Sequence, residues 1–242
     1  MANATQLLTH LKPLQIIKKA VFITALASVF LNTVSIEAAH AQSLGDLAKA
    51  AKGKGTALFR TVEFRSKSFK ALPQWARVLK KSKAEVKLLN ACANNAASCK
   101  TPQQKSWRKI IQSAKSMSRR QKLDTVNKFF NRWPYKLDSE VYGVSEYWAS
   151  PNQFMRTSGD CEDYSIAKFY ALKQLGFRDN EMRIVILKDS IRGIGHAVLA
   201  IYEKNDILIL DSLSNLILTH TKYRHYIPQY SMNSTTRWAH IK

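Results

Sequence analysis

The order of hydrophobic patterns along this 242-residue chain constrains its fold more than any other feature. The first part shows helical spacing of apolar residues in four segments: residues 72–90, 103–116, 119–132 and 163–175. The second part shows three strand-like runs: residues 182–187, 196–202 and 207–213. Because a short interval around Lys204 and Asn205 separates the last two runs, they predict a hairpin. This order predicts an α+β fold, with a helical N-terminal lobe and a central helix packed on an antiparallel sheet.

The first 41 residues have the pattern of a secretory signal. Lysines precede an apolar run over residues 20–36, and the small-residue sequence Ala39-His40-Ala41 follows it. The alternative is an uncleaved membrane anchor, although the run is short and polar for a membrane span. We therefore expect an exported protein with no transmembrane span after removal of residues 1–41.

Basic residues are concentrated in one part of the chain. Residues 42–122 carry 20 lysines and arginines against three acidic residues, whereas residues 123–242 carry 15 against 13. The excess indicates either a solvated basic helical face or a patch that attracts an acidic partner. Aromatic residues are sparse in this part, so we do not expect nucleic acid as a partner. Residues 42–70 are expected to form a mobile basic lead-in to a domain over residues 71–242.

The three cysteines divide into a pair and a single residue. Cys92 and Cys99 flank a short, turn-prone segment, which predicts a disulfide in an exported protein. Cys161 is left unpaired, and it is either a buried structural thiol or a reactive one. It directly precedes the central helix, where the helix N-terminus stabilises a thiolate. This position favours a reactive thiol.

A thiol nucleophile needs a base and a group that orients the base. His196 opens one strand of the predicted hairpin and Asp211 closes the other. If Glu203 faces Asp206 across the turn, Asp211 becomes the diagonal neighbour of His196 on the same face of the sheet. Considered singly, His196 is equally well explained as a core histidine and Asp211 as a turn residue. The three together predict a Cys161–His196–Asp211 triad.

Acidic residues crowd this thiol. Asp160, Glu162 and Asp163 flank Cys161, and Asp138 lies in the preceding loop. Nearby carboxylates raise the pKa of a thiol, and a bound cation reverses that effect. Clusters of carboxylate oxygens suit Ca²⁺, so one interpretation is a calcium site. The alternative is that the carboxylates only stabilise the helix N-terminus through its dipole.

Several segments, in the order found here, resemble one protein family. They are Asn131-Arg132-Trp133-Pro134-Tyr135, Glu146-Tyr147-Trp148, Gly159-Asp160-Cys161-Glu162-Asp163-Tyr164, His196-Ala197-Val198-Leu199 and Leu210-Asp211. From about residue 70 onward, the chain resembles the bacterial transglutaminase-like cysteine proteinases, the LapG-type periplasmic proteases. The resemblance implies a papain-like or transglutaminase-like fold, with Cys161 as nucleophile, His196 as base and Asp211 as orienting group. It also implies Ca²⁺ bound by Asp160 and Glu162, with Asp163 and Asp138 as further candidate ligands.

The resemblance also implies a biological role. Such proteases cut the N-terminal region of a large surface adhesin, which disperses a biofilm, and an inner-membrane receptor for cyclic di-GMP sequesters them. Two alternatives remain at this point. The first is an acyl-transferase or peptidoglycan amidase that uses the same kind of site with another acceptor or substrate. The second is a basic exported binding protein in which the site is vestigial.

Overall fold

The computed structural model describes residues 57–242, so the predicted signal segment and the first part of the predicted lead-in lie outside the described residues. The helices are α2 (Pro73–Asn94), α3 (Pro102–Ala114), α4 (Arg119–Phe130), α5 (Asp138–Val141), α6 (Pro151–Thr157) and α7 (Cys161–Gln174). The strands are β1 (Val62–Ser66), β2 (Met182–Asp189), β3 (Ile194–Tyr202), β4 (Ile207–Asp211), β5 (Ser214–Thr219), β6 (Tyr226–Met232) and β7 (Arg237–Ile241). Short 3-10 turns are η1 (Leu58–Arg60), η2 (Ala96–Ser98), η3 (Asp179–Glu181) and η4 (His220–Lys222).

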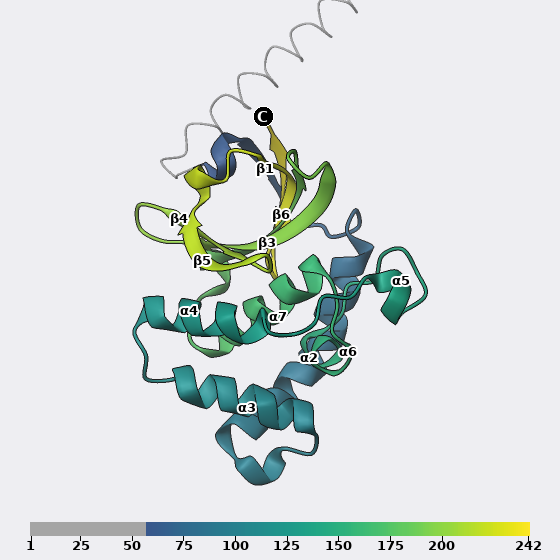
Figure 1. The fold of residues 1–242 in the computed structure, drawn as a ribbon, viewed down its shortest axis with the longest axis vertical. Coiled ribbons are helices and arrows are strands. Elements are labelled where there is room, and N and C mark those ends of the chain that lie inside the picture. Colours follow the sequence, from purple (N-terminus) through teal and green to yellow (C-terminus); the bar gives the residue numbers. More distant parts are fainter. Residues whose placement is uncertain (1–56) are drawn as a thin grey trace, which may run out of the picture. The chain divides into compact units, whose positions relative to one another are not determined.

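The strands form one antiparallel sheet in the order β1-β7-β6-β2-β3-β4-β5, and the helices lie on one of its faces (Figure 1). This confirms the predicted α+β architecture. Tyr202 pairs with Ile207, and the Glu203 amide donates to the Asp206 carbonyl. This is the hairpin register that the sequence predicted. Within the described residues, no helix combines the length and hydropathy needed to cross a bilayer.

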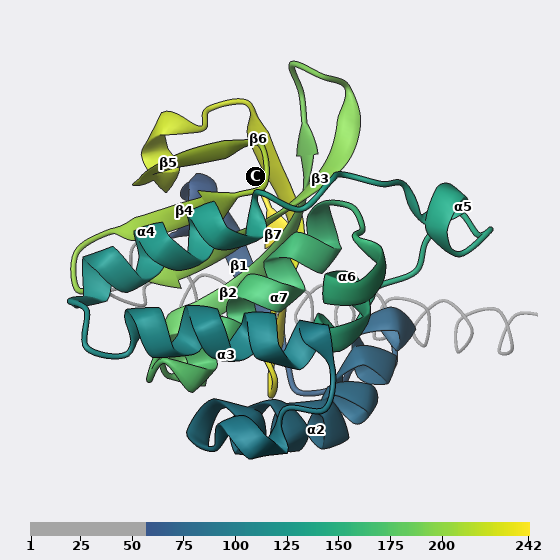
Figure 2. The same ribbon diagram turned by 60° about the horizontal axis from the view of Figure 1, so that its bottom comes forward.

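Local signals explain where the helices begin. Helix α3 starts at a proline, and the side chain of Thr101 accepts a hydrogen bond from the Gln104 amide. Helix α4 starts with a capping box in which Ser118 and Gln121 bond each other's backbone amides. Between these helices and the sheet lies α7 (Figure 2), in which every residue from Cys161 to Leu172 is buried. The first residue of α7 is therefore held from all sides.

The sheet separates two apolar clusters. The larger one contains the buried faces of the helices together with Ile184, Leu199 and Leu210 of the sheet. The smaller one lies on the opposite face and contains Val198, Ile209 and Tyr226, covered by Leu58 and Phe59 of η1.

The folded domain begins earlier than the sequence indicated. A mobile lead-in was expected up to residue 70, but Leu58 and Phe59 are buried and β1 pairs with β7. The apolar face of the sheet and the free edge of β7 both need a cover, and residues 58–66 supply it. The sequence analysis also does not predict strands β5, β6 and β7. Polar residues interrupt the alternation of apolar and polar side chains that marks a strand.

Cys92 and Cys99 form the predicted disulfide, and Cys161 is a buried free thiol. The disulfide closes a loop of sequence separation seven between α2 and α3. Replacing both cysteines, Cys92→Ala/Cys99→Ala, should lower the free energy of unfolding by about 2–3 kcal/mol, because a loop this short is freed in the unfolded chain. Urea unfolding measures the change. Thiol titration of the denatured, unreduced protein should find one thiol; three would contradict the pairing.

Lys168 of α7 is fully buried, and its ammonium has no hydrogen-bond partner among residues 57–242. Burial lowers the pKa of Lys168 to about 7, although the negative charge of Asp211 acts to raise it. An unfolded lysine titrates near pH ~10.4, so between about pH 7 and 10 the unfolded chain holds one proton more and stability should rise with pH.

Lys168→Met should therefore raise the free energy of unfolding at pH 7 by about 1–4 kcal/mol and flatten this rise. Urea unfolding from pH 7 to 10 tests it, with Lys87→Met on the exposed face of α2 as the matched control. Equal pH slopes in wild type and Lys168→Met would contradict the assignment.

Candidate active site

Cys161 is the first residue of α7, after a loop in which Ser158 has a left-handed backbone with φ 67°. Its side chain is almost fully enclosed. Burial raises the pKa of the thiol most, and the charges of Glu162 and Asp160 raise it further. A hydrogen bond from the Ala197 backbone amide acts in the opposite direction. The thiol therefore lies beside the residue that follows His196 in β3.

His196 and Asp211 meet across the predicted hairpin. The Nε2 atom of His196 lies 2.9 Å from Oδ1 of Asp211, and both side chains are buried. The hydroxyl of Tyr226 donates to Oδ2 of Asp211 at 2.6 Å, and the Leu213 amide donates to Oδ1 at 3.0 Å. Burial raises the pKa of Asp211, but the hydrogen bonds from His196, Leu213 and Tyr226 outweigh it and keep the pKa below its usual value.

This arrangement fixes the tautomer of His196. An ionised Asp211 has no proton to give, so Nε2 of the ring carries the hydrogen that joins them. The Nδ1 atom is left with its lone pair, and it makes no hydrogen bond to any described residue. The ring can therefore accept a proton at Nδ1 while the carboxylate holds its orientation.

Two residues that support Asp211 were not identified from the sequence. Tyr226 bonds the carboxylate, and its ring also meets the His196 ring edge-on at 5.7 Å. The side chain of Asn131, at the end of α4, donates to the backbone carbonyls of Asp211 and Ser214. Asn131 lies in one of the segments on which the family resemblance rests, and that position was the only sequence signal for its role. Tyr226 is the first residue of β6, a strand that the sequence did not predict, and it carried no such signal.

Tyr135 is a further residue beside the thiol. Its backbone bridges to Gly159, and its ring stacks on that of Tyr164. Burial raises the pKa of Tyr135 most, followed by the charge of Cys161, to which its hydroxyl is hydrogen-bonded. The phenol thus stays protonated and presents a hydrogen-bond donor at the sulfur. A developing oxyanion near Cys161 would find this donor and the free amides of the α7 N-terminus.

Three of the four predicted metal ligands come together. Oxygen atoms of Asp138, Asp160 and Glu162 all lie within 4.8 Å of one another. Burial raises the pKa of Asp160 to about 9, with Glu162 adding to the effect, and burial also raises the pKa of Asp138 and Glu162. One oxygen each of Asp138 and Asp160 is buried without a partner among the described residues. A set of crowded oxygen donors with unused lone pairs fits Ca²⁺.

Asp163, the fourth predicted ligand, lies outside this cluster. Its Oδ1 accepts a hydrogen bond from the Ala149 amide at 2.5 Å. Its carboxylate also packs so closely on Gly159 that a Cβ atom at that position would overlap it. Asp163 thus anchors the loop before Cys161 to the segment that precedes α6, and Gly159 is the residue that allows the approach.

Comparisons with known proteins agree with this geometry. Residues 79–242 match the family model of the bacterial transglutaminase-like cysteine proteinases. A search of curated proteins gave no match. Among solved structures, LapG of Legionella pneumophila is 30% identical, with a TM-score of 0.54 over 64% of this chain and 87% of the other.

Two further structures of the same Legionella protein also match. An EGTA-treated form is 30% identical and covers 64% of this chain and 84% of its own, with a TM-score of 0.54. A calcium-bound form is 31% identical and covers 64% and 87%, with the same TM-score. The family match over residues 79–242 and the shared fold lead to one conclusion: this chain belongs to the bacterial transglutaminase-like cysteine proteinases of the LapG type.

Proposed function

We propose that this protein is a calcium-dependent cysteine endopeptidase in which Cys161 is the nucleophile, His196 the base and Asp211 the orienting group. The observation that supports this most directly is the 2.9 Å hydrogen bond between His196 and Asp211, made next to the Ala197 amide that reaches the Cys161 sulfur. Nδ1 of His196 takes the thiol proton as the sulfur attacks the scissile carbonyl, and returns it to the leaving amine. Water then hydrolyses the thioester, with His196 accepting its proton.

Asp138, Asp160 and Glu162 are the residues that would hold Ca²⁺. When bound, the cation compensates the negative charge of these carboxylates and so favours the thiolate form of Cys161. Asp138 is suited to its part because its Oδ2 already accepts the Tyr147 amide, which fixes the carboxylate. The buried Asp163 acts separately, by holding the loop that carries the nucleophile.

For the biological role, we propose that the substrate is the N-terminal region of a large cell-surface adhesin, whose cleavage releases cells from a biofilm. We also propose a periplasmic location and an inner-membrane cyclic di-GMP receptor as the sequestering partner. Membership in the LapG-type family supports these assignments, and the Cys92–Cys99 disulfide is typical of an exported protein. N-terminal sequencing of fragments from a candidate adhesin tests the substrate; an uncut adhesin beside an active enzyme would refute it.

Cys161→Ala should abolish proteolysis, since no other described residue offers a thiol free of a disulfide. Cleavage of the substrate is followed by gel electrophoresis, and the unfolding midpoint in urea shows that the variant remains folded. Tyr226→Phe serves as the comparison: it keeps the thiol and removes only one of the bonds to Asp211, so it should retain measurable activity. Cleavage by Cys161→Ala at the wild-type rate would refute the thiol mechanism.

Removal of calcium with EGTA should stop proteolysis, and added Ca²⁺ should restore it. Mg²⁺ should restore it poorly, because it demands tighter octahedral geometry. Asp160→Asn and Glu162→Gln should lose calcium binding and activity together, whereas Cys161→Ala should lose activity alone. Calorimetric titration beside the cleavage assay measures both properties.

The matched control is Asp124→Asn, which removes a carboxylate that pairs with Arg120 on α4, away from the cluster. It should bind calcium and cleave normally. Full activity in EGTA with no bound metal would show that the acidic cluster is only a feature of the helix start.

A further inference from the structure

Helices α2 and α3 carry positive charge that nothing nearby compensates. The two helices pack against each other, and the Cys92–Cys99 disulfide lies at their connection. Helix α3 and the later part of α2 lie on the side of α7 away from the sheet (Figures 1 and 2). Residues 73–114 hold seven lysines and two arginines against one acidic residue, whereas residues 123–242 hold 15 basic and 13 acidic residues. The charge of the domain is therefore concentrated on these two helices.

The lysines form exposed stripes. All seven are exposed, and none forms an ion pair with a described residue. Lys80, Lys83 and Lys87 follow at intervals of three and four residues along α2, and Lys105 and Lys109 are four residues apart on α3. Each set therefore lies on one side of its helix. We call these five residues the basic face. Like charges at this spacing repel each other, so the arrangement does not stabilise the isolated protein.

The other charged residues of α2 and α3 are engaged within the protein. The carboxylate of Glu85 accepts hydrogen bonds from the Ser150 hydroxyl at 2.7 Å and from the Asn152 amide at 3.2 Å, so it is directed at α6. Arg77 and Arg108 each donate to backbone carbonyls of neighbouring segments. The exposed charge on these helices is therefore supplied by lysine alone.

This composition indicates a diffuse anionic surface as the partner. Lysine is a hydrated point charge, whereas arginine forms the bidentate bonds that recognise single carboxylates and phosphates. Trp75 and Trp107 are both fully buried, so these helices offer no exposed ring on which a nucleic-acid base could stack. Leu88, which follows Lys87, is 57% exposed. Lysines beside an exposed leucine suit a layer of anionic headgroups above an apolar interior.

We propose that the basic face binds the surface of an anionic lipid bilayer. The negative potential of such a surface attracts every lysine within about one Debye length, about 8 Å at physiological salt. The attraction acts on all five side chains together, so it requires no pocket. Docking through α2 and α3 would leave the sheet, which carries His196 and Asp211, on the side away from the lipid (Figure 1). This binding does not require the proposed protease activity.

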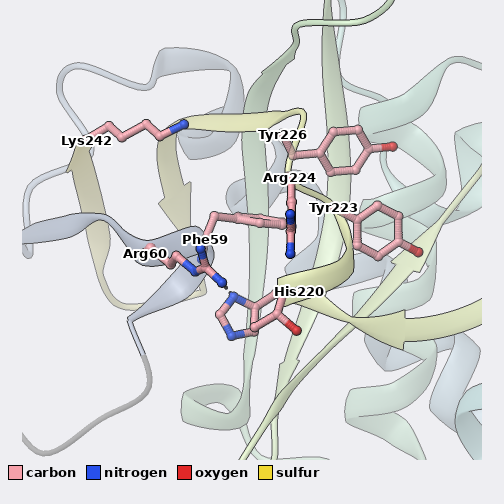
Figure 3. Close-up of a pocket in the computed structure, with 8 residues that line it drawn as sticks. Phe59, Arg60, His220, Tyr223, Arg224, Tyr226 and Lys242 are labelled. Carbon is pink, nitrogen blue, oxygen red and sulfur yellow. Dashed lines mark hydrogen bonds between the residues drawn. The ribbon is translucent and has the colours of Figure 1, made fainter.

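A second group of exposed cations provides a matched control. Arg60, Arg224 and Lys242 line a small cavity beside Phe59 (Figure 3). Phe59 covers the smaller apolar cluster, so these cations lie on the face of the sheet opposite to the helices. Removing three charges there changes the net charge of the protein as much as removing three lysines of the basic face.

Co-sedimentation of the full chain with vesicles tests the proposal at physiological ionic strength. Vesicles of phosphatidylcholine alone are compared with vesicles of equal parts phosphatidylcholine and phosphatidylglycerol. Lys80→Gln/Lys87→Gln/Lys105→Gln should weaken binding to the anionic vesicles at least about tenfold, because three attracted charges are lost. Arg60→Gln/Arg224→Gln/Lys242→Gln should weaken it less than about threefold, since these charges lie beyond the Debye length. All variants share the same N-terminal segment, so the difference between them arises in the domain.

A soluble acidic polymer separates lipid from polypeptide as the partner. Polyglutamate, added at the same concentration of negative charge as the phosphatidylglycerol, should displace little of the bound protein, because it offers no apolar layer to Leu88. The proposal is overturned if the anionic vesicles bind no more protein than the neutral ones, or if the two triple variants weaken binding equally. It is also overturned if polyglutamate displaces the protein completely, which would assign the basic face to an acidic polypeptide.

Discussion

The burial of α7 between the sheet and the other helices is the constraint on which the rest of the structure depends. The helix is enclosed from Cys161 to Leu172, so its first turn cannot shift without disturbing both layers. That rigidity fixes the thiol, but it also takes Asp160, Glu162 and Asp163 largely out of water. Buried carboxylates require protons, hydrogen bonds or a cation. The acidic cluster and the loop contacts before α7 therefore surround the proposed nucleophile at a buried helix end.

The second half of the site depends on the sheet. His196 of β3 and Asp211 of β4 meet through their side chains, and the next residue of β3, Ala197, directs its amide at the thiol. Two successive residues of β3 therefore contribute different groups to the candidate site: His196 its imidazole and Ala197 its backbone amide. Tyr226, at the start of β6, completes the arrangement by donating its hydroxyl to Asp211.

Much of this arrangement follows from the sequence. Helices α2, α3, α4 and α7, the hairpin register and the disulfide follow from spacing, because the period of apolar residues and the length of a turn are local properties. The short helices α5 and α6 have too few residues to show such a period. Strands β5 to β7 have no such local signal, since polar residues alternate irregularly and their pairing partners lie far along the chain. The bond from Tyr226 to Asp211 is likewise set by tertiary packing. Asp163 has the same charge as Asp160 and Glu162, but its side chain is directed to the Ala149 amide and not to the cluster. The sequence shows the charge of a residue but not the direction of its side chain.

The pairing of β1 with β7 has a consequence for how the molecule assembles. Val62 lies opposite Ile241, so the first and last described strands meet only after nearly the whole domain has been synthesised. Contacts of such long sequence separation close slowly, since the intervening chain must be ordered first. During synthesis from the N-terminus, β1 would remain unpaired on this edge until β7 is available. The cover that Leu58 and Phe59 give the smaller apolar cluster lies next to β1 in the chain, so it would be among the last features to form.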